Sequence, residues 1–353
     1  MLTVGVLNLG PLRQAEVTLE PLTVFVGPNN SGKSFLATII YAILSAASSP
    51  PEEVNLFPSW RYMQFPHLEP AESAAITALL ELDEQFTASN VHPRAGKVLD
   101  RWLNEVLHEY GQLVIYSIAK AFGSSVTELR RAHGSVKSAR VVISDSDLDW
   151  RVTISFGAKS TRTYIKTGNP IHVLQRLDAA TLRRVKTRSA SRRNEVALLR
   201  SSLATVLLSG LSPTLYLPAA RSGLMQSQRA IAGAIVQRAS LAGIEDVRVP
   251  ALSGVVADFL SRLLTLPRYR QGPFSKEADR LEQQVLHGHI AIQNTNSTAP
   301  EIVYRTGDSE FPIHRTSSMI SELAPVVLLI RMALYPGHIL IIEEPESHLH
   351  PAS

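Results

Sequence analysis

The spacing of hydrophobic residues near the N-terminus predicts a short ribbon, a buried strand and a buried helix. Residues 2–8 and 15–19 alternate loosely on either side of a Gly-Pro turn, which indicates two antiparallel strands. Residues 22–26 (LTVFV) are a continuous apolar run rich in β-branched side chains, the pattern of a buried strand. Residues 35–46 (FLATIIYAILSA) are apolar on most faces of a helix. We therefore expect the ribbon to lead into a parallel core strand and then into a buried helix.

The middle of the chain changes from a helical to a strand-like period. Residues 47–53 (ASSPPEE) indicate a linker after the N-terminal helix. Apolar residues recur every three or four positions in residues 72–86 and 96–122, which predicts two helices. Antiparallel strands are predicted from three short alternating runs, at residues 140–143, 150–156 and 162–165.

The C-terminal part of the chain mixes short strands with helices. Residues 214–218 (TLYLP) predict a further strand, and residues 225–242 and 252–266 have helical spacing. Three more short strands are expected at residues 291–293, 301–304 and 311–313. We find no internal repeat and no sustained heptad series in the sequence, so a long coiled-coil arm is not expected.

The residues between the predicted buried strand and the N-terminal helix fit the phosphate-binding pattern G-x-x-x-x-G-K-[ST]. They are Gly27, Pro28, Asn29, Asn30, Ser31, Gly32, Lys33 and Ser34. Together with Phe35, which opens the helix, they are the residues expected to bind the nucleotide. Backbone N–H groups of such a loop and of the helix N-terminus converge on the β-phosphate of a nucleotide. Lys33 would reach the β- and γ-phosphates and take part in catalysis, and the Ser34 hydroxyl would bind Mg²⁺. The alternative is an ordinary glycine turn between a strand and a helix.

Two carboxylates follow an apolar run near the C-terminus. In residues 337–344 (GHILIIEE), four apolar residues end in Glu343 and Glu344, which predicts a buried parallel strand. Ligands bind at the carboxyl ends of parallel strands, so these side chains would lie beside the phosphate loop. Glu343 would hold Mg²⁺ directly or through water, and Glu344 would be the general base that polarises the attacking water. The alternative is a strand that merely ends in solvated glutamates.

Three aspartates alternate between two of the predicted antiparallel strands. Asp145, Asp147 and Asp149 occupy positions one, three and five of a calcium loop, but the sixth position is Trp150 and the twelfth is Phe156. An EF-hand requires glycine and glutamate at those two positions. We therefore expect a solvated hairpin turn and no calcium site.

The densest charge run is RRVKTRSASRR. Its basic residues are Arg183, Arg184, Lys186, Arg188, Arg192 and Arg193, and no acid occurs before Glu195. A solvated helix face is the usual structure of such a run. The functional alternative is a patch that contacts the backbone of DNA or RNA. Because no aromatic residue interrupts the run, base stacking is not indicated.

Composition narrows the classes of function. The chain has 353 residues, 45% of them hydrophobic and 19% charged, which suits one large or two ordinary globular domains. Cysteine is absent, which excludes disulfides, zinc–thiolate sites and cysteine nucleophiles. A net charge of +4 permits a nucleic-acid partner without requiring one.

The sequence shows no targeting segment or membrane span. The N-terminus lacks the basic region and small-residue cleavage site of a signal peptide. Residues 323–342 form the most apolar stretch, but Pro325, Arg331, Pro336 and His338 interrupt it, so it is not a membrane span. We expect a cytoplasmic protein without a membrane partner.

The pairing of GPNNSGKS with ILIIEEPESHLHP resembles the ABC-type ATPases of the SMC-like and OLD-like class, AAA-core proteins of bacterial DNA repair and phage defence. Residues 343–351 resemble their Walker B and D-loop as one block. This resemblance explains His348 and His350 better than a pair of metal ligands does. Residues 215–223 (LYLPAARSG) also resemble a segment common in this class. The resemblance implies an α/β P-loop NTPase, an ABC-ATPase-like head with an antiparallel β subdomain and a mainly helical insertion. It also implies a homodimer that binds and hydrolyses ATP with Mg²⁺ between its subunits.

The resemblance also places a signature motif at residues 316–323 (TSSMISEL), opening a helix. Its hydroxyls, those of Ser317 and Ser318, would meet the γ-phosphate bound by the partner subunit. Met319 stands where the family usually has glycine. Two rival functions remain open. One is a nucleotide-gated binding or regulatory protein with little turnover. The other is a P-loop kinase, although proteins of that class are not expected to have two glutamates followed by SHLHP.

The resemblance implies a domain division as well. Residues 1–48 and 300–353 form the expected ATPase head, with a core strand near 214–223. Residues 50–299 form a largely helical insertion with a short β portion near 140–166. In the family, another core strand ending in a switch histidine follows the D-loop, and this chain stops at Ser353. We therefore expect a fragment or truncation of a longer protein, whose remainder carries a nuclease or another effector.

Overall fold

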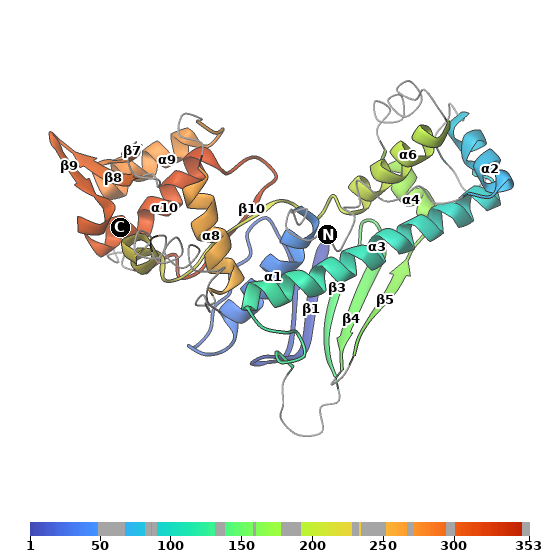
Figure 1. Cartoon of the computed structure of the whole chain (residues 1–353), viewed down its shortest axis with the longest axis horizontal. Coiled ribbons are helices and arrows are strands. Elements are labelled where there is room, and N and C mark those ends of the chain that lie inside the picture. The colour runs from blue at the N-terminus through green and yellow to red at the C-terminus, as the bar shows by residue number, and fades with distance from the viewer. Residues whose placement is uncertain are drawn as a thin grey trace, which may run out of the picture. The chain divides into compact units, whose positions relative to one another are not determined.

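A computed structural model shows a mixed α/β chain (Figure 1), which confirms the coarse fold class. It describes residues 1–48, 68–81, 86, 90–130, 138–157, 160–177, 192–227, 233, 252–266, 271–293 and 301–347. The chain forms two compact units, and each is described here by itself. Unit 1 comprises residues 1–119 and 124–212, and unit 2 comprises residues 120–123 and 213–353. In the part of the chain that is described, no helix is long and apolar enough to cross a membrane.

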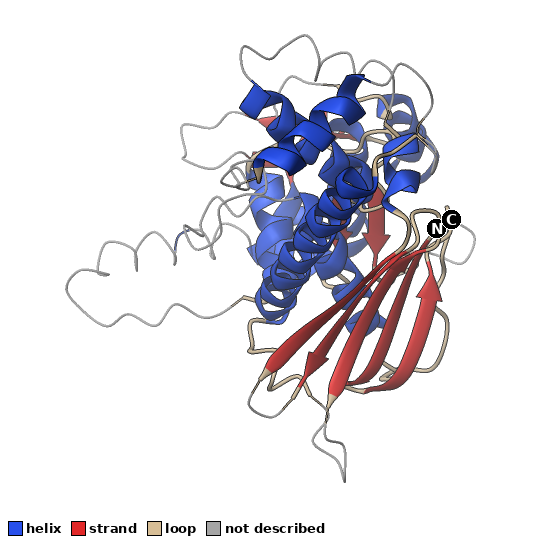
Figure 2. Ribbon diagram, turned by 90° about the vertical axis from the view of Figure 1, so that its right-hand side faces the viewer, coloured by secondary structure: helices blue, strands red, loops and turns tan. Residues whose placement is uncertain are grey.

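Unit 1 contains a five-stranded antiparallel sheet in the order β2-β1-β3-β4-β5, which Figure 2 draws in red. The strands are β1 (Leu2–Leu9), β2 (Leu12–Thr18), β3 (Ala139–Asp145), β4 (Trp150–Phe156) and β5 (Thr161–Thr167). Their alternating patterns therefore predicted the correct secondary structure. The N-terminal ribbon and the strands near 140–166 belong to one sheet, because β1 pairs with both β2 and β3. The division between the units, near residue 212, also falls inside the expected insertion.

Helices cover one face of this sheet. The helices of unit 1 are α1 (Lys33–Ser48), α2 (Pro70–Glu81), α3 (Pro93–Phe122), α4 (Pro170–Gln175) and α6 (Arg192–Leu207). The 30-residue helix α3 crosses the strands (Figure 1), and a Cβ on its Gly111 would lie 2.7 Å from Thr163 Cγ2 of β5. Tyr110 of α3 donates to the Ile43 carbonyl of α1 at 3.0 Å. The apolar helix predicted at residues 35–46 is therefore confirmed and buried beneath α3. Phe86, the expected end of the helix predicted at residues 72–86, is not helical, and residues 82–85 lie outside the described residues.

The buried strand predicted at residues 22–26 does not form. These residues belong to no strand of the described structure, and Leu22, Val24 and Val26 are 82%, 67% and 86% exposed. An apolar run becomes a core strand only where neighbouring strands accept its backbone hydrogen bonds and helices cover both faces. The only parallel pair in the described chain belongs to unit 2. This prediction was wrong because the sequence pattern contains no information about those neighbours.

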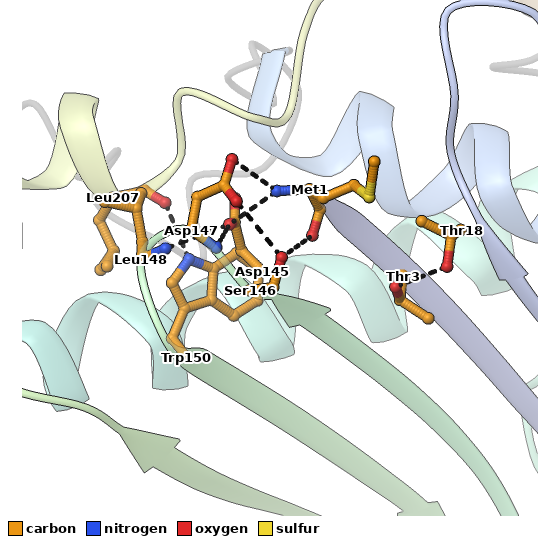
Figure 3. A network of polar contacts seen from close by, with 9 residues as sticks. All are labelled: Met1, Thr3, Thr18, Asp145, Ser146, Asp147, Leu148, Trp150 and Leu207. Atoms are coloured by element: carbon orange, nitrogen blue, oxygen red, sulfur yellow. Dashed lines mark hydrogen bonds and ion pairs between the residues drawn. The ribbon is translucent and has the colours of Figure 1, made fainter.

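The acidic turn between β3 and β4 holds the N-terminus (Figure 3). Asp145 is 5% exposed, and its Oδ1 accepts from the Met1 ammonium at 3.3 Å and from the Asp147 N–H at 2.8 Å. The Met1 ammonium also pairs with Asp147 Oδ2 at 2.8 Å, and these carboxylates raise the pKa of the amino group. The hairpin turn is confirmed, but Asp145 is buried and not solvated. The Asp145 carboxylate can be buried because its Oδ1 accepts these hydrogen bonds.

Replacing Asp145 by alanine is expected to lower the free energy of unfolding by about 1–3 kcal/mol, because the N–H groups of Asp147 and Leu148 lose their acceptor. Asp145→Asn retains an oxygen at Oδ1 but no charge, so its loss should be smaller. Urea denaturation measures both variants, and Asp149→Asn, at an exposed side chain in a left-handed backbone position that asparagine tolerates, is the matched control. Equal stabilities of Asp145→Ala and Asp149→Asn would contradict the structural role given to Asp145.

Unit 2 contains two small sheets. Strand β6 (Thr214–Leu217) pairs in parallel with β10 (Ile339–Ile342), and β7 (His289–Gln293), β8 (Glu301–Thr306) and β9 (Ser309–Pro312) form an antiparallel sheet. All five strands were predicted within a few residues. Strand β10 is half-buried and not fully buried, because its only pairing among the described strands is with β6.

The helices of unit 2 pack around the apolar helix α10. They are α8 (Gly254–Leu264), α9 (Ser275–Leu281) with its π-helical continuation (Glu282–Leu286), a 3-10 turn (Ile313–Arg315) and α10 (Ser318–Met332). Helices α8 and α10 were predicted, and α9 was not. Of the helix predicted at residues 225–242, residues 225–227 are helical, and 228–232 and 234–242 lie outside the described residues.

Candidate functional site

The glycine loop of unit 1 adopts the backbone conformation that its sequence requires. Gly27, Asn30 and Gly32 have φ values of 151°, 63° and 93°, in the region that favours glycine and tolerates asparagine. Helix α1 begins directly at Lys33, with its first hydrogen bond from the Leu36 N–H to the Gly32 carbonyl at 2.9 Å. The N–H groups in the first turn of a helix have no partner within the helix. The loop is therefore a turn that presents a helix N-terminus, as the phosphate-binding pattern predicts.

Lys33 lies across this loop. Its Nζ donates to the carbonyl oxygens of Gly27 and Pro28, both at 2.8 Å. The ammonium is thereby held at the mouth of the loop, where residues 27–31 and Ser34 are exposed. A cation beside a helix N-terminus, with an exposed hydroxyl on the next residue, is suited to bind a polyphosphate and its metal.

Residues of the hairpin β1–β2 pack against the glycine loop and the start of α1. A Cβ on Gly32 would lie 2.6 Å from Leu12 Cδ2, so Gly32 packs directly against the start of β2. The Phe35 ring packs over Gly10 in the hairpin turn, where an added Cβ would lie 2.2 Å from Cζ of the ring. Gly10 has a φ of 53°, which favours glycine independently of this contact. Phe35, expected at the nucleotide, therefore packs against the hairpin.

Glu343 is fixed at the end of β10 by groups from the β6 side. Its N–H donates to the Leu217 carbonyl at 3.0 Å, which continues the parallel ladder by one residue. Its carboxylate accepts from the Tyr216 hydroxyl at 2.7 Å and from the Ala219 N–H at 3.1 Å. A carboxylate held in this way keeps further lone pairs for a ligand. A carboxylate oxygen of this kind is a ligand that Mg²⁺ prefers.

Glu344 follows in a left-handed backbone conformation, with a φ of 42°. Its carbonyl accepts from the Ser347 N–H at 3.0 Å and from Arg221 Nη2 at 3.2 Å. Its side chain is exposed and makes no hydrogen bond or ion pair with any described residue. The backbone of Glu344 is therefore held while its carboxylate remains accessible, as a general base requires.

Arg221 connects these glutamates to helix α10. The guanidinium is fully buried and donates from Nη1 to the Glu343 carbonyl at 2.6 Å and to the Pro218 carbonyl at 3.0 Å. Its Nη2 lies 2.6 Å from Glu322 Oε1, and Glu322 is also fully buried. Burial lowers the pKa of Arg221, and the facing carboxylates of Glu322, Glu343 and Glu344 partly offset that effect.

Breaking this buried ion pair is expected to be costly. Arg221→Met should lower the free energy of unfolding by about 3–5 kcal/mol, because Glu322 is left as an uncompensated buried charge. The double variant Arg221→Met/Glu322→Leu should lose less than the two single variants together, because it removes both charges. The exposed pair Lys120–Asp258 is the matched control, and Lys120→Ala should cost at most about 1 kcal/mol. Thermal denaturation measures all four variants. Strict additivity of the two single changes would show that the charges are not coupled.

The expected signature residues open α10. The Ser317 hydroxyl accepts from the Ile320 N–H at 3.4 Å and caps the helix, and Ser318 begins it. Both serines are exposed, and Met319 packs partly against the core of unit 2. Glu322 lies one turn after Ser318, and its Oε2 accepts from the Ser222 N–H at 2.8 Å. Helix α10 and the end of β10 therefore share one network through Arg221 and Glu322.

The structure thus places the predicted residues in two groups. Lys33, Ser34 and the loop belong to unit 1, and Glu343, Glu344, Ser317 and Ser318 belong to unit 2. The sequence analysis assigned no role to Arg221 or Glu322. Two signals could have indicated them. Arg221 lies in the segment LYLPAARSG, and Glu322 is the one acid in the apolar run that becomes α10.

The structure does not describe the side chains of the basic run. Arg183, Arg184, Lys186 and Arg188 lie outside the described residues, as do His348 and His350 of the D-loop-like block. Arg192 and Arg193 open helix α6, but their side chains are not described. The prediction that this run contacts DNA or RNA therefore stays a prediction.

Within the described ranges, no group of three or more histidine, aspartate or glutamate side chains could hold a metal ion by itself. Any Mg²⁺ at Glu343 would therefore need further ligands, such as a nucleotide or water. A scan of the sequence against models of protein families and a search of curated proteins both found no match.

Proposed function

We propose that this chain binds ATP with Mg²⁺ through the loop of residues 27–34 and hydrolyses it. The observation that carries the proposal is the position of Lys33, whose ammonium is held across a glycine loop at the N-terminus of α1. An ordinary glycine turn needs no lysine at this place. The hydrogen bonds from Lys33 to the loop carbonyls are replaced by contacts with phosphate oxygens when a nucleotide binds.

Each proposed residue has one role in hydrolysis. The loop N–H groups and Lys33 bind the phosphates. Ser34 and Glu343 would hold Mg²⁺, which would neutralise charge on the phosphate oxygens. A water oxygen forms a bond to the γ-phosphorus while the bond from that phosphorus to the β–γ bridging oxygen breaks. Glu344 takes the proton from the water, and ADP leaves with the bonding electron pair.

We further propose that the chain is a P-loop NTPase of the ABC-like class and forms a homodimer around ATP. In this arrangement Ser317 and Ser318, at the N-terminus of α10, contact the γ-phosphate bound by the partner subunit. The exposed hydroxyls at a capped 15-residue helix support this role. A role in DNA repair or phage defence follows from the resemblance of the motifs alone.

The rival function is a nucleotide-gated regulatory protein with little turnover. The hydrogen bonds that Lys33 and Glu343 already make favour this function, because both residues must be released or shared before they serve a nucleotide. ATP would then act as a clamp that holds one conformation.

One experiment separates the two functions. ATP binding is measured by calorimetry and phosphate release by a steady-state assay, with Mg²⁺, in the presence and absence of double-stranded DNA. Binding with turnover supports the ATPase, and binding without turnover supports the regulatory protein. Absence of ATP binding by a folded chain would contradict both.

A further inference from the structure

The five-stranded sheet of unit 1 has a second face that α3 does not cover. Side chains alternate along each strand, so Val152 and Ile154 of β4 point to the helices and their neighbours point to the opposite side. Side chains also alternate in β3 and β5. There the odd-numbered residues face the helices and are the more buried, and the even-numbered residues face the opposite side and are the more accessible. We call the uncovered side the open face.

Basic side chains gather on the open face. Arg140 of β3, Arg151 of β4, and Arg162 and Lys166 of β5 all point to this side and are exposed. None of the four makes an ion pair with a described residue. The open-face positions of β3, β4 and β5 include no acid, and Glu16 of β2 is the one acid among those of the five described strands. Among the described residues, the face therefore carries a net positive charge.

The strand register arranges these charges in two rows. Arg151 stands opposite Lys166, while Ser155 stands between Arg140 and Arg162. The rows are four residues apart along β4, or about 13 Å at the usual rise of a strand. Charges spread in this way over a flat surface do not converge on a single small anion. They suit a partner that repeats its negative charges over a similar distance, as a nucleic-acid backbone does.

The remaining side chains on the face favour a duplex. The Thr153 hydroxyl lies between the basic rows, and the Ser144 and Ser155 hydroxyls lie within them. Such hydroxyls commonly donate to phosphate oxygens. Tyr164, 55% exposed, is the single aromatic at the open-face positions of these strands. Platforms for single strands stack several bases on several aromatic rings. A membrane-binding surface needs large apolar side chains, and this face exposes none besides Tyr164.

We infer that the open face binds the phosphate backbone of double-stranded DNA. This surface differs from the basic run at residues 183–193 and from the glycine loop. It does not require ATP, so DNA binding and nucleotide binding can be measured separately on the same protein.

The test compares two pairs of substitutions that change net charge equally. Arg151→Gln/Lys166→Gln removes charge from the open face, and Arg94→Gln/Lys97→Gln removes it from exposed positions of α3. The full chain is titrated against a fluorescently labelled duplex over a series of salt concentrations, without nucleotide. Thermal denaturation confirms that both variants are folded.

The open-face variant is expected to bind about tenfold more weakly than the wild type, with a salt slope smaller by about 2, because two phosphate contacts are lost. The α3 variant should bind within about twofold of the wild type. Equal losses in both variants would show a general effect of net charge and overturn the inference, as would a wild type that does not bind the duplex.

A third variant separates the duplex from a single strand. Tyr164→Ala should leave duplex affinity within about twofold of the wild type, because backbone contacts do not use stacking. A wild type that prefers single-stranded DNA of the same sequence, with a large loss in Tyr164→Ala, would make the face a stacking platform and overturn the inference. Binding to anionic vesicles without binding to duplex would overturn it in favour of a membrane surface.

Discussion

Glu344→Gln is expected to reduce ATP turnover about 10²–10⁴-fold while ATP binding persists, because glutamine keeps the shape of the side chain but cannot accept the proton of the attacking water. The backbone of Glu344 is held by Arg221 and Ser347, so the substitution should not disturb the end of β10. Its side chain has no partner in the described structure whose loss would complicate the result. Phosphate release under saturating ATP measures the effect.

The matched control is Glu346→Gln, which removes an exposed carboxylate two residues further along. It should leave turnover near the wild-type value. If both variants retain full turnover, the general base lies elsewhere. If the head closes around ATP as a dimer, Glu344→Gln should also accumulate as an ATP-bound dimer in size-exclusion chromatography. A monomer at saturating ATP would argue against that arrangement.

Lys33→Ala is expected to abolish ATP binding and to leave the fold intact. The ammonium is the positive charge at the mouth of the loop, and without it the phosphates lose their principal counter-charge. The shape of the loop should survive, because Gly32 packs against Leu12 and the Phe35 ring packs over Gly10. Neither contact involves the lysine side chain.

Calorimetric titration with Mg·ATP measures this loss, and circular dichroism checks the fold. Lys97→Ala removes an exposed lysine from α3 of the same unit and should bind ATP normally. Undiminished affinity in a folded Lys33→Ala protein would place the nucleotide site outside this loop.

Local patterns predicted most elements of the fold. In β3 and β4, every second residue is apolar, because one face of the sheet is buried under α3 while the other stays open. The glycines of the loop at residues 27–34 were also predictable, since Gly27 and Gly32 adopt positive φ values that other residues avoid. Both features depend on neighbours within a few residues, so a single sequence contains the information.

Pairings between distant segments were not predictable. Val4 of β1 stands opposite Ile143 of β3, and no local pattern specifies which strand fills that place. For the same reason, the apolar run at residues 22–26 looked like a core strand but has no strand beside it in the described structure. A strand is stabilised by the ladder that it joins, and the ladder is a property of the whole fold.

In the candidate site, too, some features were predicted from the sequence and others became known only from the tertiary structure. By itself, the sequence determined which residues we propose for the site, because the order of glycines, lysine and serine at residues 27–34 and the two carboxylates after an apolar run fit the pattern of phosphate and metal ligands. Only the tertiary structure decided that Arg221 and Glu322, 101 residues apart, are buried together and hold the backbone of Glu343 and Glu344. A buried charge is stable only when its partner and its hydrogen bonds are in place, and those groups come together only when the unit folds.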